Sequence, residues 1–424
     1  MQKKKSLTFA LFISLGIFVL TSCSPKVTGF NPKSGRVETE VTIDGKNFRP
    51  IADENTIKFD GIVASDVLQA SQSQIIVRVP NGAKTGKISV TTGRGTGDSD
   101  EDFEVIREGY ALAIGLNGLD PNHYEGWGGI LAGCEPDARD MKDIAVSQGL
   151  KAEILLTAQA TREAVLGKLN DLAEKLQPDD LLVVSYSGHG GQVPDQNGDE
   201  VDGLDETWCL YNGELIDDEL NAAWAKFKKG IRILVFSDSC HSGTVLKMIK
   251  SDYENPSQNR IRELNKAWRE LRTLPERENT KLRSILKIKP APKDATKVAP
   301  STELISRLAP ADALRRVYQK NREFYYEIGS KAPREDTTSV NAYVILISGC
   351  EDNQTSLDWE SNGLFTFMLK QVWNKGEFNG SHLDFHQAIK MKVLEANRGQ
   401  SPKYYTVGIE EDKVFVMQRP FTVK

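Results

Sequence analysis

The stretch that decides the fold is Ile231-Arg-Ile-Leu-Val-Phe236, which runs almost directly into Asp238-Ser-Cys-His-Ser-Gly243. A second apolar run, Leu181-Leu-Val-Val-Ser185, is likewise followed by Ser187-Gly-His-Gly-Gly191. Short apolar runs of this kind are typical of buried parallel strands, and open α/β sheets place their sites at the carboxyl ends of such strands. One predicted strand end therefore supplies a thiol and the other an imidazole.

These two groups, Cys240 and His189, predict nucleophilic catalysis of the cysteine protease type. A thiol attacks well only as thiolate, and an imidazole can take its proton and later protonate the leaving amine. The glycines beside His189 let a substrate approach closely, so the backbone N–H groups of Gly190 and Cys240 are the candidates to stabilise an oxyanion. His241 is a rival base, but successive residues rarely face each other.

The surrounding pattern predicts an α/β fold with a mainly parallel sheet flanked by helices. Further strands are expected at Tyr110–Gly115, Ala152–Leu156 and Tyr343–Ile347. Helices are expected from Glu135 to Gly149, with a glycine at the end, and from Thr161, a good N-cap residue.

The N-terminal part of the chain has a different pattern. Residues 27–106 contain short alternating runs separated by turn residues, which predicts a small β-sandwich. Three segments resemble the TIG (IPT) family of immunoglobulin-like domains: Val27-Thr-Gly-Phe-Asn-Pro32, Val41-Thr-Ile-Asp-Gly-Lys-Asn-Phe48 and Phe59-Asp-Gly61. The resemblance implies a spacer or contact module, and we assign it residues 23–106.

The first residues predict export. A basic start, Met1 to Lys5, precedes an apolar stretch from Leu7 to Leu20 that is short for a membrane span. The following Leu20-Thr-Ser-Cys23 resembles the lipobox of bacterial lipoproteins. The resemblance implies a signal peptide at 1–22, lipid on Cys23, and a protein tethered to a membrane of the bacterial cell envelope, on the periplasmic side or at the outer membrane.

The composition limits the binding partners and the covalent cross-links that we expect. The formal net charge of -5 argues against nucleic acid. Five cysteines in 424 residues are too sparse for a disulfide scaffold, although a Cys134–Cys209 or Cys209–Cys350 bridge stays open.

The histidine and cysteine motifs resemble those of metacaspases, within the caspase-like peptidases. Ile347 to Ser356, followed by Gly363-Leu-Phe-Thr366, resembles the start of their small portion. The resemblance implies a caspase-hemoglobinase-like fold, with a large portion at 107–250 and a small portion at 340–424. It also implies a His189/Cys240 dyad that cleaves protein or peptide substrates after Arg or Lys. A clostripain- or gingipain-like protease of the same fold is the close rival, and an inactive caspase-like scaffold is the rival of another class.

Specificity for a basic residue requires buried carboxylates, because an unpaired cation is costly to desolvate. The family's pocket positions match Cys134, Asp137, Ser187 and Asp238, and all four are polar here. A caspase that cuts after Asp would need arginines in these motifs instead.

Calcium is a possible activator and no cofactor is required. The resemblance implies ligands at Asp205, Asp217 and Asp218, but a fourth family position is Lys247, a cation. The acidic loop from Asp195 to Glu206 is loosely similar to an EF-hand loop, with Glu200 where the sharp turn needs Gly.

Residues 251–339 interrupt the α/β pattern with a basic, partly helical insertion. A Lys/Arg-rich connector suits a protease that cuts after Arg or Lys, so self-cleavage between about Lys250 and Arg334 is a hypothesis. The alternative is a docking subdomain that is never cut.

Overall fold

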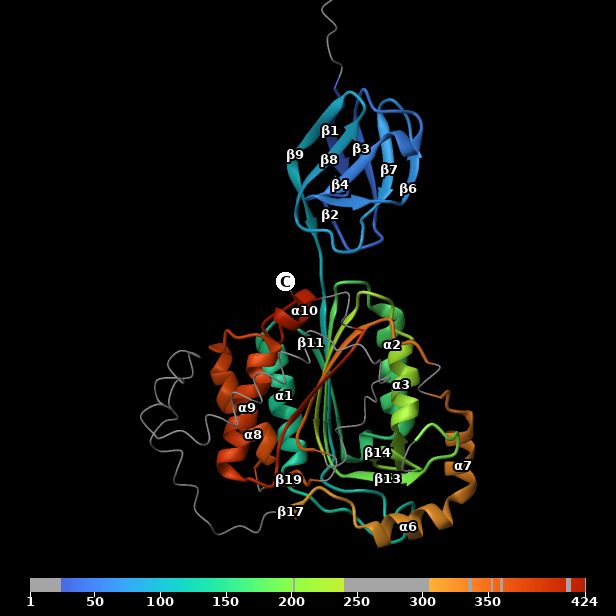
Figure 1. Cartoon of the computed structure of the whole chain (residues 1–424), viewed down its shortest axis with the longest axis vertical. Helices are drawn as coiled ribbons and strands as arrows, with labels where there is room; N and C mark the ends of the chain where they lie inside the picture. The colour runs from blue at the N-terminus through green and yellow to red at the C-terminus, as the bar shows by residue number, and fades with distance from the viewer. Residues whose placement is uncertain are drawn as a thin grey trace, which may run out of the picture. The chain divides into compact units, whose positions relative to one another are not determined.

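The computed structural model describes residues 24–200, 203–239, 305–334, 338–351, 354–358, 361–408 and 413–423. They form two compact units, of which the first ends at Ile106 and the second begins at Arg107 (Figure 1). Each unit buries a hydrophobic core of its own. Within the described ranges, no helix combines the length and the apolar character needed to cross a membrane.

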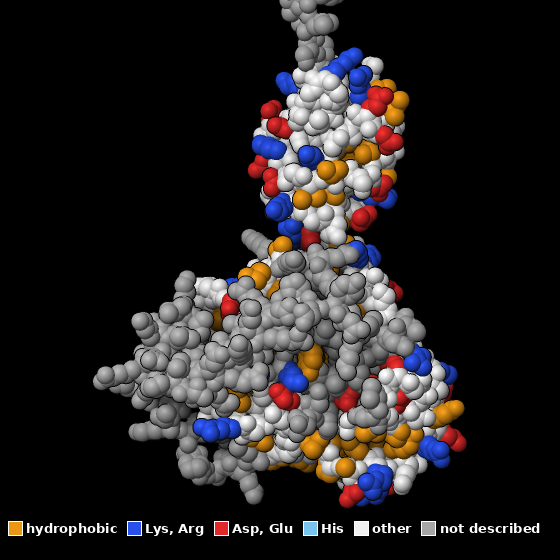
Figure 2. Space-filling model, viewed as in Figure 1, with side chains coloured by type: hydrophobic (Ala, Val, Ile, Leu, Met, Phe, Trp, Pro, Cys, Tyr) orange, Lys and Arg blue, Asp and Glu red, His pale blue; other side chains and the backbone are white. Residues whose placement is uncertain are grey.

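The first unit is the predicted β-sandwich. One sheet has the strand order β1-β3-β7-β6 and the other β2-β9-β8-β4-β5. Inward side chains such as Val41, Phe59 and Phe103 are fully buried, as expected where two sheets pack face to face. Basic and acidic side chains are interspersed over the face seen in Figure 2. The strands are β1 Lys26–Asn31, β2 Ser34–Gly35, β3 Glu40–Lys46, β4 Thr56–Phe59, β5 Ile62–Ala64, β6 Val67–Ala70, β7 Gln74–Arg78, β8 Gly86–Thr92 and β9 Gly95–Val105.

The second unit is built on a six-stranded sheet, which confirms the predicted α/β fold. Its order is β11-β10-β12-β16-β18-β20, and all neighbours are parallel except β18 and β20. The central strands are buried along their whole length, as strands covered on both faces must be. Their bounds are β10 Gly109–Gly115, β11 Lys151–Leu156, β12 Leu181–Ser187, β16 Arg232–Asp238, β18 Tyr343–Ser348 and β20 Lys403–Val407.

Helices cover both faces of this sheet (Figure 1). On one face lie α1 Cys134–Ser147, α8 Leu364–Trp373 and α9 His382–Ala396, and on the other α2 Arg162–Lys175 and α3 Asp217–Ala225. Thr161 caps α2 by accepting a hydrogen bond from the Ala164 N–H, as predicted. Gly149, just beyond α1, adopts a φ of 82°, which is the left-handed conformation that a terminating glycine allows.

Smaller elements gather beyond the carboxyl ends of β12 and β16. An antiparallel sheet follows the histidine motif, with the order β13-β14-β15. The described end of the insertion contributes a strand that pairs with β19, and then two helices. The bounds are β13 Gly190–Pro194, β14 Leu204–Leu210, β15 Gly213–Ile216, β17 Ile305–Ser306, α6 Ala311–Lys320, α7 Arg322–Lys331 and β19 Leu357–Asp358. The last helix, α10 Lys413–Met417, lies at the other end of the unit, against α9 (Figure 1).

Candidate active site

The carboxyl ends of β12 and β16 lie side by side in the sheet. In their parallel register, Ser187 is the partner of Asp238. His189 follows Ser187 by two residues in the sequence, and Cys240 follows Asp238 by the same number. Cys240 lies outside the described residues. The first residues of the histidine and cysteine motifs, Ser187 and Asp238, therefore lie at adjacent strand ends at the same level of the sheet.

His189 is a buried side chain with a fixed backbone. Its carbonyl accepts hydrogen bonds from the Tyr186 hydroxyl at 2.7 Å and from the Cys209 N–H at 3.0 Å. The Trp127 ring lies 4.9 Å from the imidazole, centroid to centroid. Burial lowers the pKa of His189 to about 4, and the nearby backbone of Arg307 opposes part of that shift. A neutral imidazole at neutral pH is the state that a general base requires.

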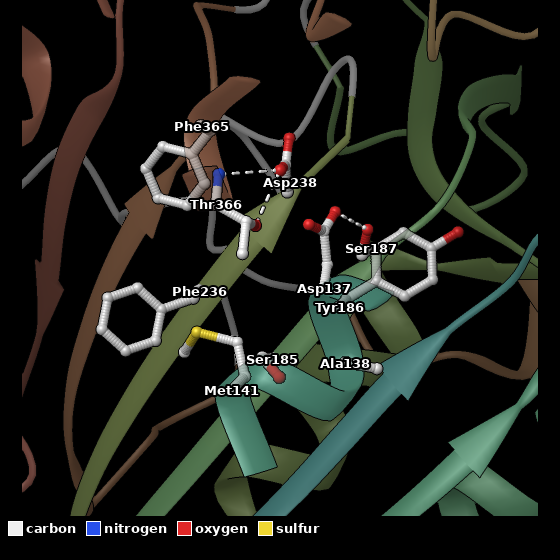
Figure 3. Close-up of a pocket in the computed structure, with 10 residues that line it drawn as sticks. All are labelled: Asp137, Ala138, Met141, Ser185, Tyr186, Ser187, Phe236, Asp238, Phe365 and Thr366. Atoms are coloured by element: carbon white, nitrogen blue, oxygen red, sulfur yellow. Dashed lines mark hydrogen bonds between the residues drawn. The ribbon is translucent and has the colours of Figure 1, made fainter. Parts of the chain in front are cut away.

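Three buried carboxylates, which we call the pocket carboxylates, converge next to this histidine. They are Asp137 from α1, Asp238 from β16 and Asp358 from β19, each exposing 1% of its surface. Figure 3 shows Asp137 and Asp238 beside a small cavity, with Ser187 donating a hydrogen bond to Asp137 at 2.7 Å.

Each pocket carboxylate is fixed by neutral donors. The Thr366 hydroxyl and N–H donate to Asp238 at 2.8 and 3.1 Å. The Ala132 N–H donates to Asp358 at 2.8 Å. The Gly363 N–H donates to Asp137 at 3.0 Å. Such fixed acceptors are preorganised for a cation.

The cation in this pocket is the guanidinium of Arg307, from the described end of the insertion. Its Nη2 lies 2.7 Å from Asp137 and 2.7 Å from Asp358, and its Nη1 lies 2.9 Å from Asp238. Nη1 also donates to the Ser187 hydroxyl at 2.9 Å. Burial disfavours the charge on Arg307, but the pocket carboxylates outweigh that effect and raise its pKa above the ordinary value. Burial raises the pKa of Asp137 in turn, and the guanidinium opposes that shift.

The backbone of Arg307 is held as firmly as its side chain. Its carbonyl accepts a hydrogen bond from the Gly190 N–H at 3.1 Å, and its own N–H donates to the Ser356 carbonyl at 2.9 Å. Gly190 is the residue whose N–H the sequence predicts as an oxyanion donor. A carbonyl beside His189 is therefore already in contact with that donor.

A second group of acids, the hairpin carboxylates, lies around the loop between β13 and β14. Carboxylate oxygens of Asp195, Asp199 and Asp205 lie within 4.8 Å of one another, and so do those of Glu200, Asp205 and Asp217. Asp218 stands outside these two groups, and its carboxylate accepts a hydrogen bond from the Asn197 side chain at 2.5 Å. Burial and the neighbouring acids raise the pKa of Asp205 to about 8 and that of Asp218 to about 7.

Comparison with known families identifies both units. The model of the caspase domain, a peptidase family, matches residues 108–413, and the IPT/TIG domain model matches residues 25–105. The chain belongs to the caspase-domain peptidases. Its first unit is a TIG domain, so the family resemblances in both halves of the sequence are confirmed.

Relatives of this caspase-domain protein include metacaspases. Metacaspase-1 of Schizosaccharomyces pombe is 28% identical over 69% of this chain and 66% of its own length. Metacaspase-1 of Saccharomyces cerevisiae is 28% identical over 62% of this chain and 58% of its own. The chain thus spans less than two thirds of the length of these curated relatives. A crystal structure of a Geobacter sulfurreducens protein is 41% identical, with a TM-score of 0.57, and covers 75% of this chain and 99% of its own.

The structure brings most of the predicted pocket residues of this caspase-domain protein together. Asp137, Ser187 and Asp238 all contact Arg307, whereas Cys134 contributes its thiol to the wall, 3.9 Å from Asp358. Burial raises the pKa of that thiol well above its usual range.

Sequence reasoning missed Asp358 and Arg307. Asp358 lies two residues beyond the quoted small-portion motif. The available signal was a carboxylate between two large apolar residues, Leu357 and Trp359. Arg307 is one basic residue among many in the insertion, and nothing in its immediate sequence marks it.

The remaining predictions concern the cysteines and residues that the structure does not describe. Cys134, Cys209 and Cys350 are buried, and no disulfide joins any two of them, so neither the Cys134–Cys209 nor the Cys209–Cys350 bridge is present. Four further features named from the sequence lie outside the described residues: Cys23, the predicted lipidation residue; His241, the rival base; Lys247, the cation; and the insertion before Ile305.

Proposed function

We propose that the protein is a cysteine endopeptidase that cleaves after Arg or Lys, with Cys240 as nucleophile and His189 as base. The observation that carries this proposal is the pocket of three buried carboxylates beside His189, which accommodates a guanidinium. Buried carboxylates without a cation are costly, so such a pocket selects a basic side chain over an apolar or acidic one.

The catalytic roles follow from the positions of the groups. His189 accepts the thiol proton of Cys240, and the thiolate attacks the carbonyl carbon of the substrate. The Gly190 N–H stabilises the resulting oxyanion, and the Cys240 N–H is the expected second donor. The protonated imidazole then donates to the leaving amine, and water hydrolyses the thioester.

The pocket geometry favours Arg over Lys. The bound guanidinium uses Nη1, Nη2 and Nε, and the Nε–H donates to Asp358 at 3.3 Å. A lysine ammonium is a single point of charge and has no counterpart to this planar array. We expect kcat/KM for an Arg peptide to exceed that for the Lys peptide by about 10-fold or more.

Hydrolysis of fluorogenic peptides ending in Arg, Lys or Asp tests the function directly. The wild type should cleave after Arg, more slowly after Lys, and not after Asp. Cys240→Ala and His189→Ala should each lose roughly 10³-fold or more in rate. Cleavage after Asp alone would refute the specificity, and no cleavage under any condition would favour the inactive scaffold.

Calcium activation is a second proposal, and it rests on the hairpin carboxylates. Their donors are all oxygens, as Ca²⁺ prefers, and Asp205 Oδ1 is buried without a hydrogen-bond partner among the described residues. Asp195, Asp199, Glu200, Asp205 and Asp217 are the residues that would hold the ion. A bound cation would neutralise these acids at the end of β13, the strand that begins with the oxyanion donor Gly190.

Calcium titration after chelator treatment tests this second proposal. The wild type should gain both thermal stability and peptidase rate, whereas Asp205→Asn should gain neither. Asp143→Asn, an exposed acid on α1, is the control that should respond like the wild type. Equal responses of Asp205→Asn and the wild type would place the effect of calcium elsewhere.

We also propose that the protein is attached to the bacterial cell envelope through lipid on Cys23, with the TIG domain as spacer or contact module. The lipobox-like Leu20 to Cys23 supports this proposal. Cys23→Ser should move the protein from the membrane fraction to the soluble fraction, and it should abolish incorporation of labelled fatty acid. An unchanged membrane fraction would contradict the proposal.

A further inference from the structure

The segment around Arg307 lies in the active site as an extended peptide. Its strand β17 pairs antiparallel with β19, with Ile305 opposite Asp358 and Ser306 opposite Leu357. The next residue, Arg307, continues the pairing through its N–H to the Ser356 carbonyl. Adding a strand to a sheet edge is a general way for a protein to bind an extended peptide, with a side-chain pocket supplying specificity.

The peptide bond that follows Arg307 is held on both sides by one residue. The Gly190 N–H donates to the carbonyl of Arg307 at 3.1 Å, and the Gly190 carbonyl accepts from the Ala309 N–H at 3.1 Å. The intervening Leu308 forms a parallel bridge with Gly190 and exposes 38% of its surface. The carbonyl of residue 307 thus contacts the oxyanion donor, with His189 next to it.

We infer that residues 305–309 are an internal substrate and that the enzyme cuts its own chain at the Arg307–Leu308 bond. This inference rests on the proposed function of the same site. The Cys240 thiolate bonds to the carbonyl carbon of Arg307, and the C–N bond to Leu308 breaks. The leaving amine takes the proton held by His189. Water then hydrolyses the thioester, which leaves a carboxylate on Arg307 and restores the thiol.

Until this bond is cut, the segment keeps external substrates out. The guanidinium of Arg307 is wholly buried and uses all three pocket carboxylates, so no second cation can enter. A substrate competes with a tethered group, whose effective concentration is high. The intact chain is therefore self-inhibited, and cleavage removes the tether on the downstream side of Arg307.

The chain downstream of the cut stays bound by contacts of its own. The Asn321 side chain donates to the His123 carbonyl at 3.1 Å, and the His123 ring lies 2.8 Å from the Tyr325 hydroxyl. Leu314 and Val317 of α6 belong to the core. Cleavage thus releases Arg307 while α6 and α7 remain in place.

The first experiment maps the cut by intact mass and N-terminal sequencing of purified wild type, Cys240→Ala, Arg307→Gln and Arg315→Gln. A fragment that begins at Leu308 is expected from the wild type and from Arg315→Gln, whose side chain is exposed on α6. Neither Cys240→Ala nor Arg307→Gln should yield it. Arg307→Gln should still hydrolyse Arg peptides, and without the initial lag that an uncut wild type shows.

The second experiment measures pocket occupancy without catalysis. In the Cys240→Ala background, adding Arg307→Gln should tighten binding of a fluorescent peptide ending in Arg by about 10-fold or more. Equal affinities, or a wild type that cleaves Arg peptides but never yields the Leu308 terminus, would overturn the inference and leave the proposed function standing. If neither the wild type nor Arg307→Gln cleaves any Arg peptide, the proposed function fails as well.

Discussion

The caspase-like unit contains two clusters of acids, one fully buried and one partly buried, that differ in how their charge is balanced. In the pocket, Asp137, Asp238 and Asp358 surround the guanidinium of Arg307. At the β13–β14 hairpin, burial and then the neighbouring carboxylates raise the pKa of Asp205 to about 8. Each cluster combines residues from strands or strand-end loops with one helix residue, Asp137 of α1 in the pocket and Asp217 of α3 at the hairpin. The difference therefore lies in the counter-ion rather than in the kind of element that supplies the acids.

The comparison teaches what each cluster is suited to bind. Buried carboxylates are tolerated when a cation and fixed hydrogen-bond donors compensate them. The pocket presents its oxygens to a planar cation together with the Ser187 hydroxyl, which suits a guanidinium. The hairpin places carboxylate oxygens of each group within 4.8 Å of one another, which suits a compact metal ion or protons.

Removing one charge from the pocket should have the largest effect. Asp238→Asn deletes the partner of Arg307 Nη1 and leaves an amide that also has to face the Thr366 donors. We expect kcat/KM for Arg peptides to fall by about 10³-fold, because truncating one member of a buried charge pair costs several kcal/mol. Asp143→Asn on the surface of α1 is the matched control for charge alone. A loss below 10-fold would mean that Asp238 contributes little to recognition.

Another buried carboxyl, that of Glu214 on β15, sharpens the comparison because it belongs to neither cluster. Its Oε2 accepts from the Thr207 hydroxyl at 2.7 Å, and its Oε1 has no hydrogen-bond partner among the described residues. Burial raises its pKa from 4.5 to about 7. The native state therefore keeps the proton that the unfolded chain releases above about pH 4.5. The stability from this group is present below that pH and is lost as the pH rises through about 7.

Glu214→Gln should remove this pH dependence, because an amide does not titrate. Between pH 5 and pH 8 the wild type should lose up to about 3 kcal/mol of unfolding free energy relative to the variant, at 1.36 kcal/mol per pKa unit. Urea unfolding of both proteins at the two pH values measures the difference. Parallel pH profiles would show that the carboxyl is already ionised in the native state.

The sequence predicts the scaffold well because apolar runs determine it. The runs ending at Ser185 and Phe236 become central strands, and their register brings Ser187 opposite Asp238. Asp137 and Asp238 were assigned to the pocket through the family resemblance, and both contact the guanidinium. The sequence therefore predicts which residues line this part of the pocket, although not how they are arranged.

Two features of the site depend on long-range contacts that no local pattern encodes. Asp358 reaches the pocket from a two-residue strand, and it is held by the N–H groups of Ala132 and Gly133, more than 220 positions earlier. Arg307 enters from an insertion that the sequence marks only as basic. Arg307, rather than another basic residue of the insertion, reaches the pocket because the chain pairs with the sheet edge just before it, through β17 and β19.

The smallest expected effect separates charge from geometry within the pocket. Asp358 is the acid that accepts from both Nε and Nη2 of Arg307, and a lysine side chain has no group equivalent to Nε. Asp358→Asn should therefore lower kcat/KM for an Arg peptide by about 10-fold and that for the matching Lys peptide by less, so that the Arg-to-Lys ratio falls. Equal losses for the two peptides would mean that Asp358 contributes only its net charge. In that case the fork-like geometry around the guanidinium would not be the source of the preference for Arg.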